Sequence, residues 1–132
     1  MPIVVDTSAV IAVAANEPLK ARLVELTRGQ ELIAAATLPW EIGNAVSAMF
    51  KRKKATLEQG LALVAQFQQI PIRLVDVPLD ESVALAAALN IYAYDAYVIQ
   101  CARHTGHAVL SLDGGLIDAA RRAGVAILEV TP

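Results

Sequence analysis

The sequence predicts an α/β fold with a mostly parallel sheet of about five strands flanked by helices. Short apolar runs alternate with segments of helical spacing along the whole chain. The apolar runs are continuous and do not alternate with polar residues, which favours a parallel sheet covered on both faces. The predicted strands are residues 3–5, 32–36, 72–75, 109–111 and 126–130.

Capping and turn residues set the predicted helix boundaries. Pro18 suits the first turn of a helix, and Thr37 and Asp80 are candidate N-caps. Thr56 with Gln59 has the spacing of a capping box, so the helices on either side of residues 52–55 should form a hairpin. The predicted helices are residues 9–15, 18–28, 37–51, 56–69, 80–90, 94–104 and 114–122.

Length and composition favour one small globular domain with apolar surface to spare. A chain of 132 residues is long enough for one domain, which we expect to span residues 1–132. Hydrophobic residues make up 56% of it and the mean hydropathy is +0.50, more than one small core needs. We therefore expect part of the apolar surface to face a protein partner.

Charge and hydropathy exclude two other classes of protein. Acidic residues interrupt every apolar run before it reaches the roughly 18 residues of a membrane span, so no membrane association is expected. The first residues lack a basic leader, and we expect a cytoplasmic protein. A net charge of −2 does not describe a protein that holds polyanions by bulk electrostatics. Any nucleic-acid site must therefore be local.

Four acidic residues stand in apolar surroundings, unlike most others in the chain: Asp6, Glu41, Asp95 and Asp113. A carboxylate in such a setting is costly unless it is capped, paired or bound to a cation. Asp6 and Asp113 each follow a predicted strand and should lie at the carboxyl edge of the sheet, where ligands bind in such folds.

Each acid also has an ordinary structural interpretation. Asp6 and Asp95 could cap helices, and Asp113 could be a turn residue before two glycines. Glu41 and Asn44 could form a polar stripe on one helix. None of the four is decisive alone, but together they point to a single site.

These residues and their neighbours resemble the PIN-domain family, most closely the VapC-type toxins of bacterial toxin–antitoxin pairs. The resemblance spans nearly the whole chain and rests on the order of four motifs: Ile3-Val4-Val5-Asp6-Thr7-Ser8-Ala9, Glu41-Ile42-Gly43-Asn44-Ala45, Tyr94-Asp95-Ala96 and Leu110-Ser111-Leu112-Asp113. It implies a three-layer sandwich and a metal-dependent endoribonuclease that uses Mg²⁺, with Mn²⁺ able to substitute. It also implies a small antitoxin protein as partner.

The resemblance assigns roles to individual residues. The family's metal-binding and catalytic acids correspond to Asp6, Glu41, Asp95 and Asp113, and its supporting polar positions to Thr7, Ser8, Asn44 and Ser111. Ser111 stands where the family often has threonine, and two glycines replace a more usual charged pair after Asp113. Hydrolysis of a phosphodiester needs charge neutralisation and a more acidic water, which a carboxylate-bound cation supplies. We expect Asp6 and Asp95 to be direct ligands, and Glu41 and Asp113 to ligate directly or through water.

Other surface features suggest partners. The basic run Lys51, Arg52, Lys53 and Lys54 could hold RNA phosphates near the cleft, or be a solvated helix end. Trp40, Phe50 and Phe67 are candidate anchors for the antitoxin, although aromatic residues at such positions are more often core. The apolar surplus and the VapC-like motifs together predict a homodimer.

Two alternative functions remain open, and a third is disfavoured by the sequence. The chain could be a PIN-like nuclease that acts on DNA or in RNA processing without an antitoxin, because the metal chemistry is the same. It could also be a catalytically silent PIN-fold binding module. A haloacid-dehalogenase-like phosphatase also places an Asp after its first strand, but needs a second Asp where this chain has Ser8.

Overall fold

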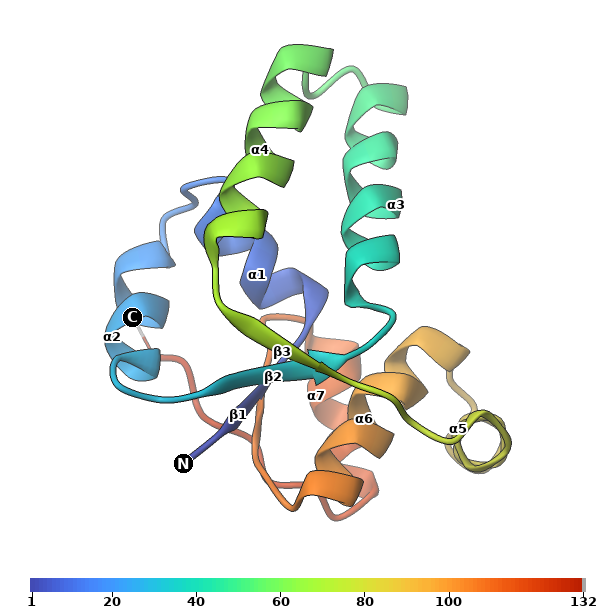
Figure 1. The fold of residues 1–132 in the computed structure, drawn as a ribbon. Coiled ribbons are helices and arrows are strands. Elements are labelled where there is room, and N and C mark those ends of the chain that lie inside the picture. Colours follow the sequence, from blue (N-terminus) through green and yellow to red (C-terminus); the bar gives the residue numbers. More distant parts are fainter. Residues whose placement is uncertain (132) are drawn as a thin grey trace.

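The computed structural model describes residues 1–131 (Figure 1). Its strands are β1 (Ile3–Val5), β2 (Leu32–Ala35), β3 (Ile72–Val75) and β4 (Val109–Leu110). Its helices are α1 (Thr7–Ala14), α2 (Lys20–Thr27), α3 (Leu38–Lys51), α4 (Leu57–Gln69), α5 (Leu79–Leu89), α6 (Ala93–Thr105) and α7 (Gly114–Arg122). The predicted α/β class and the order of the elements are confirmed.

The sheet contains four parallel strands in the order β3-β2-β1-β4. The prediction of a full fifth strand at residues 126–130 is wrong, because in the described chain this segment makes only a parallel bridge between Val109 and Ile127. Two backbone hydrogen bonds flank the bridge, from Val109 N to the Ala126 carbonyl and from Leu128 N to the Val109 carbonyl. Since β4 is two residues long, it offers no ladder beyond this single step.

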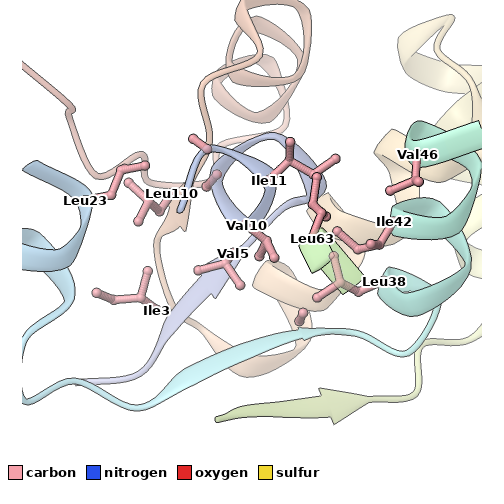
Figure 2. Packing of buried hydrophobic residues seen from close by; sticks show 13 residues of the cluster. Ile3, Val5, Val10, Ile11, Leu23, Leu38, Ile42, Val46, Leu63 and Leu110 are labelled. Carbon is pink, nitrogen blue, oxygen red and sulfur yellow. The ribbon is translucent and has the colours of Figure 1, made fainter. Parts of the chain in front are cut away.

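Helices cover both faces of the sheet and complete three layers (Figure 1). Successive side chains of a strand point to opposite faces. Ile3 and Val5 therefore join a cluster with α1, α2, α3 and α4, whereas Val4 joins a second cluster with α5, α6 and α7. Figure 2 shows the first cluster, in which Leu38 of α3 and Leu63 of α4 pack beside α1. The predicted three-layer arrangement is confirmed.

Helices α3 and α4 form the predicted hairpin, and Thr56 and Gln59 form the predicted capping box. Gly60 makes the close approach of the two helices possible, since a Cβ there would lie 2.6 Å from Phe50 Cε1 and 2.9 Å from Val46 Cγ1. Phe50 and Phe67 are partly buried against the first cluster. Each ring therefore packs partly against this cluster, and its role as an anchor for a partner stays a prediction.

Two helices, α2 and α5, begin at other residues than those predicted from the sequence. The N-cap of α5 is Pro78 rather than Asp80, because the Pro78 carbonyl already accepts hydrogen bonds from the backbone N and the hydroxyl of Ser82. Asp80 instead lies in the first turn, where its negative charge interacts favourably with the helix dipole. Pro18 precedes α2, which begins at Lys20.

Among the described residues, no single helix is long and apolar enough to cross a membrane. Helices α5 and α6 meet such a test only as a pair, and the chain bends by 113° between them.

Candidate functional site

The four predicted acids line one cleft of about 480 Å³ beyond the carboxyl ends of β1 and β4. Asp6 directly follows β1, and Asp113 follows β4 after two intervening residues. Glu41 and Asp95 lie in the first turns of α3 and α6. Four separate elements thus bring four carboxylates to one cavity, as the position of Asp6 and Asp113 at the sheet edge predicted.

Asp6 is the most buried of the four, with 5% of its surface exposed. Its Oδ1 accepts the Ala9 backbone N–H at 3.0 Å and so caps α1. The Ser8 hydroxyl lies 2.8 and 2.9 Å from the two carboxylate oxygens, and the Ser111 hydroxyl donates to Oδ2 at 2.5 Å. The capping interpretation of Asp6 is therefore correct, and the same carboxylate also faces the cleft.

Backbone groups orient both serine hydroxyls toward Asp6. The Leu112 N–H donates to Ser8 Oγ at 2.9 Å, and the Asp113 N–H donates to Ser111 Oγ at 3.0 Å. A serine hydroxyl has one proton and accepts with its lone pairs. Because these oxygens receive backbone protons, their own protons are free to point at the carboxylate. The turn after β4 thus holds Asp6 in one orientation.

Glu41 is fixed by two threonines from different elements. Thr7 Oγ1 donates to Glu41 Oε1 at 3.3 Å, and Thr37 Oγ1 donates to Oε2 at 2.9 Å. Thr7 begins α1, whereas Thr37 precedes α3. Each carboxylate oxygen of Glu41 therefore has one hydroxyl partner.

Asp113 and Asp95 keep more of their oxygen atoms free. Asp113 Oδ1 caps α7 by accepting from the backbone N–H groups of Gly115 and Leu116, at 2.9 and 3.3 Å. Within residues 1–131, neither Asp113 Oδ2 nor the Asp95 carboxylate receives a hydrogen bond from the protein. Three oxygen atoms in the cleft are thus available to water or a cation.

Three of the four acids have a raised pKa. Burial raises the pKa of Asp6, Glu41 and Asp95 above their usual values. Hydrogen bonds oppose this increase at Asp6 and Glu41, but Asp95 has none. Like-charge repulsion adds to it: Asp113 acts on Asp6 and on Asp95, and Asp6 acts on Glu41 and on Asp95. Such a cluster favours the binding of a cation, which offsets the repulsion.

The donor chemistry of the cleft fits a hard divalent cation. As the side chains stand, no three His, Cys, Asp or Glu side chains of the described chain form a closed ligand group. Mg²⁺ does not require one, since it keeps several waters and usually takes one or two carboxylates together with substrate phosphate oxygens. An all-oxygen set without histidine or cysteine suits Mg²⁺ or Mn²⁺ better than zinc.

A PIN domain family model matches residues 3–122 of the chain. The protein belongs to the PIN domain family. The resemblance seen in the sequence is thereby confirmed at the level of the family. No curated protein sequence matched the chain.

Solved structures of similar fold include VapC20 from Mycobacterium tuberculosis, a Sarcin-Ricin loop cleaving toxin, with TM-score 0.65, 19% identity and coverage of 98% of this chain and 99% of that one. FitAcB from Neisseria gonorrhoeae has TM-score 0.66 at 18% identity, covering 96% of each chain. VapBC2 from Rickettsia felis, bound to a DNA fragment from its promoter, has TM-score 0.67 at 14% identity, covering 97% of this chain and 98% of that one. At these identities the likeness establishes a shared fold.

The supporting residues of this PIN domain are only partly those that the sequence indicated. Thr7 and Ser8 contact acids directly, and Asn44 lines the cleft. Sequence reasoning missed Thr37, which it interpreted as a helix cap, and Glu17, a fifth carboxylate on the cleft wall. The spacing of four residues between Thr37 and Glu41 was the signal for the first, because it places both on one side of a helical turn.

The basic run lies exposed at the far end of α3, and its members lie at different positions relative to the cleft. The cleft-lining stripe of α3 consists of Glu41, Asn44, Ala45 and Ala48, and one further turn brings it to Lys51. Lys54 instead lines a separate groove between α4 and the end of α1. Lys53 occupies the turn with a φ of 57°. The four basic residues are therefore not equivalent with respect to the cleft.

Proposed function

We propose that this PIN domain is a metal-dependent endoribonuclease that hydrolyses RNA phosphodiester bonds. The observation that carries the proposal is the convergence of Asp6, Glu41, Asp95 and Asp113 on one cleft, with Asp6 fixed by two serine hydroxyls. Mg²⁺, or Mn²⁺ in its place, would be held there by Asp6 and Asp95 and would supply charge neutralisation on the phosphate and a more acidic water.

The remaining acids orient the reacting groups. Glu41, held by one hydroxyl on each oxygen, would ligate the cation directly or through water and accept a hydrogen bond from the attacking water. Asp113 has one oxygen engaged by α7 and presents the other to the cleft, where it can ligate through water. The phosphate backbone would leave the cleft along the Asn44 and Ala48 face of α3 toward Lys51.

A substrate panel tests the proposal against its nearest rival, a PIN nuclease that acts on DNA. The purified protein is incubated with single-stranded RNA, structured RNA, single-stranded DNA and duplex DNA of the same sequence, with Mn²⁺ or with EDTA. The proposal predicts internal cleavage of RNA only, and only with metal. Cleavage of DNA at an equal rate would favour the rival, and cleavage of nothing would favour the silent binding module.

We further propose that the enzyme is the toxin of a toxin–antitoxin pair. Support comes from the fold that it shares with VapC20, a toxin, and with VapBC2 and FitAcB. A basic side chain of the antitoxin would enter the acidic cleft and compete with the cation. Phe50 and Phe67 are partly buried, so the most accessible apolar side chains of the α3–α4 hairpin are Trp40, Leu57 and Leu61, which are all exposed.

Cellular expression tests the toxin proposal separately from the nuclease proposal. Expression of the chain alone should arrest growth, and coexpression with a small neighbouring gene should restore growth and yield a complex inactive on RNA. Harmless expression of an active nuclease that binds no product of a neighbouring gene would refute the toxin assignment and leave the nuclease standing.

We also propose that the protein is cytoplasmic and forms a homodimer; the exposed apolar residues of α5 support the homodimer. Leu79 and Val83 are 64% and 53% exposed and stand four residues apart on one helix face, and Tyr92, just after this helix, is 87% exposed. Exposed apolar residues that share a helix face are candidates for a protein interface. The mass of the purified protein in solution tests this, and Leu79→Asp should shift a dimer to a monomer.

A further inference from the structure

Thr37 stands at the N-cap position of α3 but does not cap it. An N-cap threonine usually accepts a backbone N–H from the first helical turn. The Thr37 side chain accepts none; its φ and ψ are −76° and −10°, and its hydroxyl proton goes to Glu41 instead. The N–H groups of Trp40 and Glu41 bond to the Thr37 backbone carbonyl.

The next helix provides an internal comparison. Thr56 occupies the same position at the start of α4 and makes both contacts of a capping box with Gln59, at 3.1 and 2.9 Å. Two threonines of one chain, each at a helix N-cap, therefore use their hydroxyls differently. Departures from a local rule tend to occur at functional sites. The difference points to a role for Thr37 in the cleft rather than in the helix.

Thr7 completes the arrangement from another part of the fold. It lies 34 residues away from Glu41 in sequence and reaches the carboxylate oxygen that Thr37 does not contact. One donor on each oxygen leaves the remaining lone pairs of both oxygens free for a water or a cation. A glutamate side chain has considerable rotamer freedom, which these two bonds remove before any ligand arrives.

We propose that Thr7 and Thr37 are positioning residues that clamp Glu41 in the orientation needed for cation binding, so that the two hydroxyls set the metal affinity of the cleft. The inference rests on the proposed metal-dependent function. Groups that orient a metal ligand typically change metal affinity by about 10- to 100-fold when they are removed.

Direct Mn²⁺ titration of the metal-free protein, by calorimetry or electron paramagnetic resonance, tests the clamp without substrate. Thr37→Val removes the hydroxyl at nearly constant volume and should weaken Mn²⁺ binding by about 10- to 100-fold, whereas Thr37→Ser should remain within about threefold of wild type. The matched control is Thr56→Val. It should lower the melting temperature through loss of the cap, with no change in Mn²⁺ affinity.

A double-mutant cycle with Glu41→Gln shows whether Thr37 acts through Glu41. If it does, Thr37→Val should add little to the affinity lost in Glu41→Gln alone. Wild-type affinity in Thr37→Val, or an equal further loss in the Glu41→Gln background, would overturn the inference and leave the proposed function intact. A wild-type protein that binds no Mn²⁺ would overturn both.

Discussion

The Ser111 hydroxyl donates to Asp6 Oδ2 at 2.5 Å and joins two residues that are 105 positions apart in sequence. The contact ties the end of β1 to the turn after β4, and it involves the most buried acid of the cleft. Hydroxyl–carboxylate hydrogen bonds are among the shorter ones in proteins, and Ser111 Oγ itself accepts the Asp113 N–H at 3.0 Å.

The main effect of losing this hydroxyl should be a weaker Mn²⁺ affinity rather than a lower melting temperature. Ser111→Ala is expected to weaken Mn²⁺ affinity by about 10- to 100-fold and to lower RNA cleavage accordingly. Ser82 is a suitable control, because it is also fully buried and bonds to a backbone carbonyl outside the cleft. Ser82→Ala should lower the melting temperature and leave Mn²⁺ affinity unchanged. Equal Mn²⁺ affinity in both variants would show that Ser111 only stabilises the fold.

Lys51 and Lys54 should contribute differently to RNA binding. Lys51 continues the cleft-lining face of α3, whereas Lys54 lines another groove. Lys51→Gln is expected to reduce by about one unit the slope of log affinity against log salt, and Lys54→Gln to leave it close to wild type. The two substitutions remove the same charge. A wild-type slope in both variants would mean that the run is a solvated helix end, and an equal decrease in both would mean that Lys54 also contacts phosphate.

The pH dependence should reflect the raised pKa values of the cleft. Because burial and mutual repulsion raise the pKa of Asp6, Glu41 and Asp95, protons compete with metal at a higher pH than exposed acids would allow. Cleavage should fall as pH drops through this range, and saturating Mn²⁺ should move the fall to lower pH. Rate profiles at low and saturating Mn²⁺ check this, and profiles that coincide would disprove the competition.

The same pKa shifts make a prediction for the stability of the metal-free protein. A carboxyl whose pKa is raised on folding binds protons more tightly in the folded state, so its contribution to stability declines as pH rises from its usual pKa through the raised one. Asp95→Asn should therefore stabilise the metal-free protein at neutral pH. Thermal unfolding with EDTA measures it. A melting temperature below that of wild type at pH 7 would contradict the expectation.

Helix packing can be tested away from the cleft with two glycines. Gly60→Ala should destabilise the protein by about 1–3 kcal/mol, because its Cβ would overlap Phe50 and Val46. Gly43 lies on the exposed face of α3 with no atom near its Cβ position. Gly43→Ala should be neutral or stabilise by up to about 1 kcal/mol. Denaturant unfolding measures the free energy of unfolding of both variants. A Gly60→Ala protein as stable as the wild type would mean that α3 and α4 lie farther apart than in this structure.

The features of the fold that depend on neighbouring residues were mostly predicted from the sequence. The alternation of strands and helices, the capping box at Thr56 and the placement of Asp6 at the sheet edge follow from neighbouring residues. The prediction of a fifth strand was wrong because the length of that strand depends on the length of β4, its neighbour in the sheet. Strand β4 ends after two residues, where the chain turns at Ser111. No local pattern could reveal that.

The site was predicted in its acids and less well in what holds them. The four carboxylates stand out because each interrupts an apolar run. Within one helical turn, the hydroxyl of Thr37 could accept a backbone N–H as a cap or donate to Glu41. It donates to Glu41, which also receives the hydroxyl of Thr7 from α1, and this long-range contact has no local signal in the sequence. Contacts such as that of Ser111 with Asp6 depend on the closed sheet and are invisible to spacing arguments.

The rate of RNA cleavage by Asp95→Asn, with Mn²⁺ present, is the most direct test of metal-dependent RNA cleavage in this cleft. Asp95 has no hydrogen-bonding partner in the described chain, so the substitution removes a proposed cation ligand without breaking a contact of the fold. We expect a loss of about two orders of magnitude or more, wild-type activity in the control Asp76→Asn, an exposed acid outside the cleft, and no wild-type cleavage in EDTA. Undiminished cleavage by Asp95→Asn would contradict the role of Asp95 in the site, and undiminished cleavage by the wild type in EDTA would contradict the metal dependence.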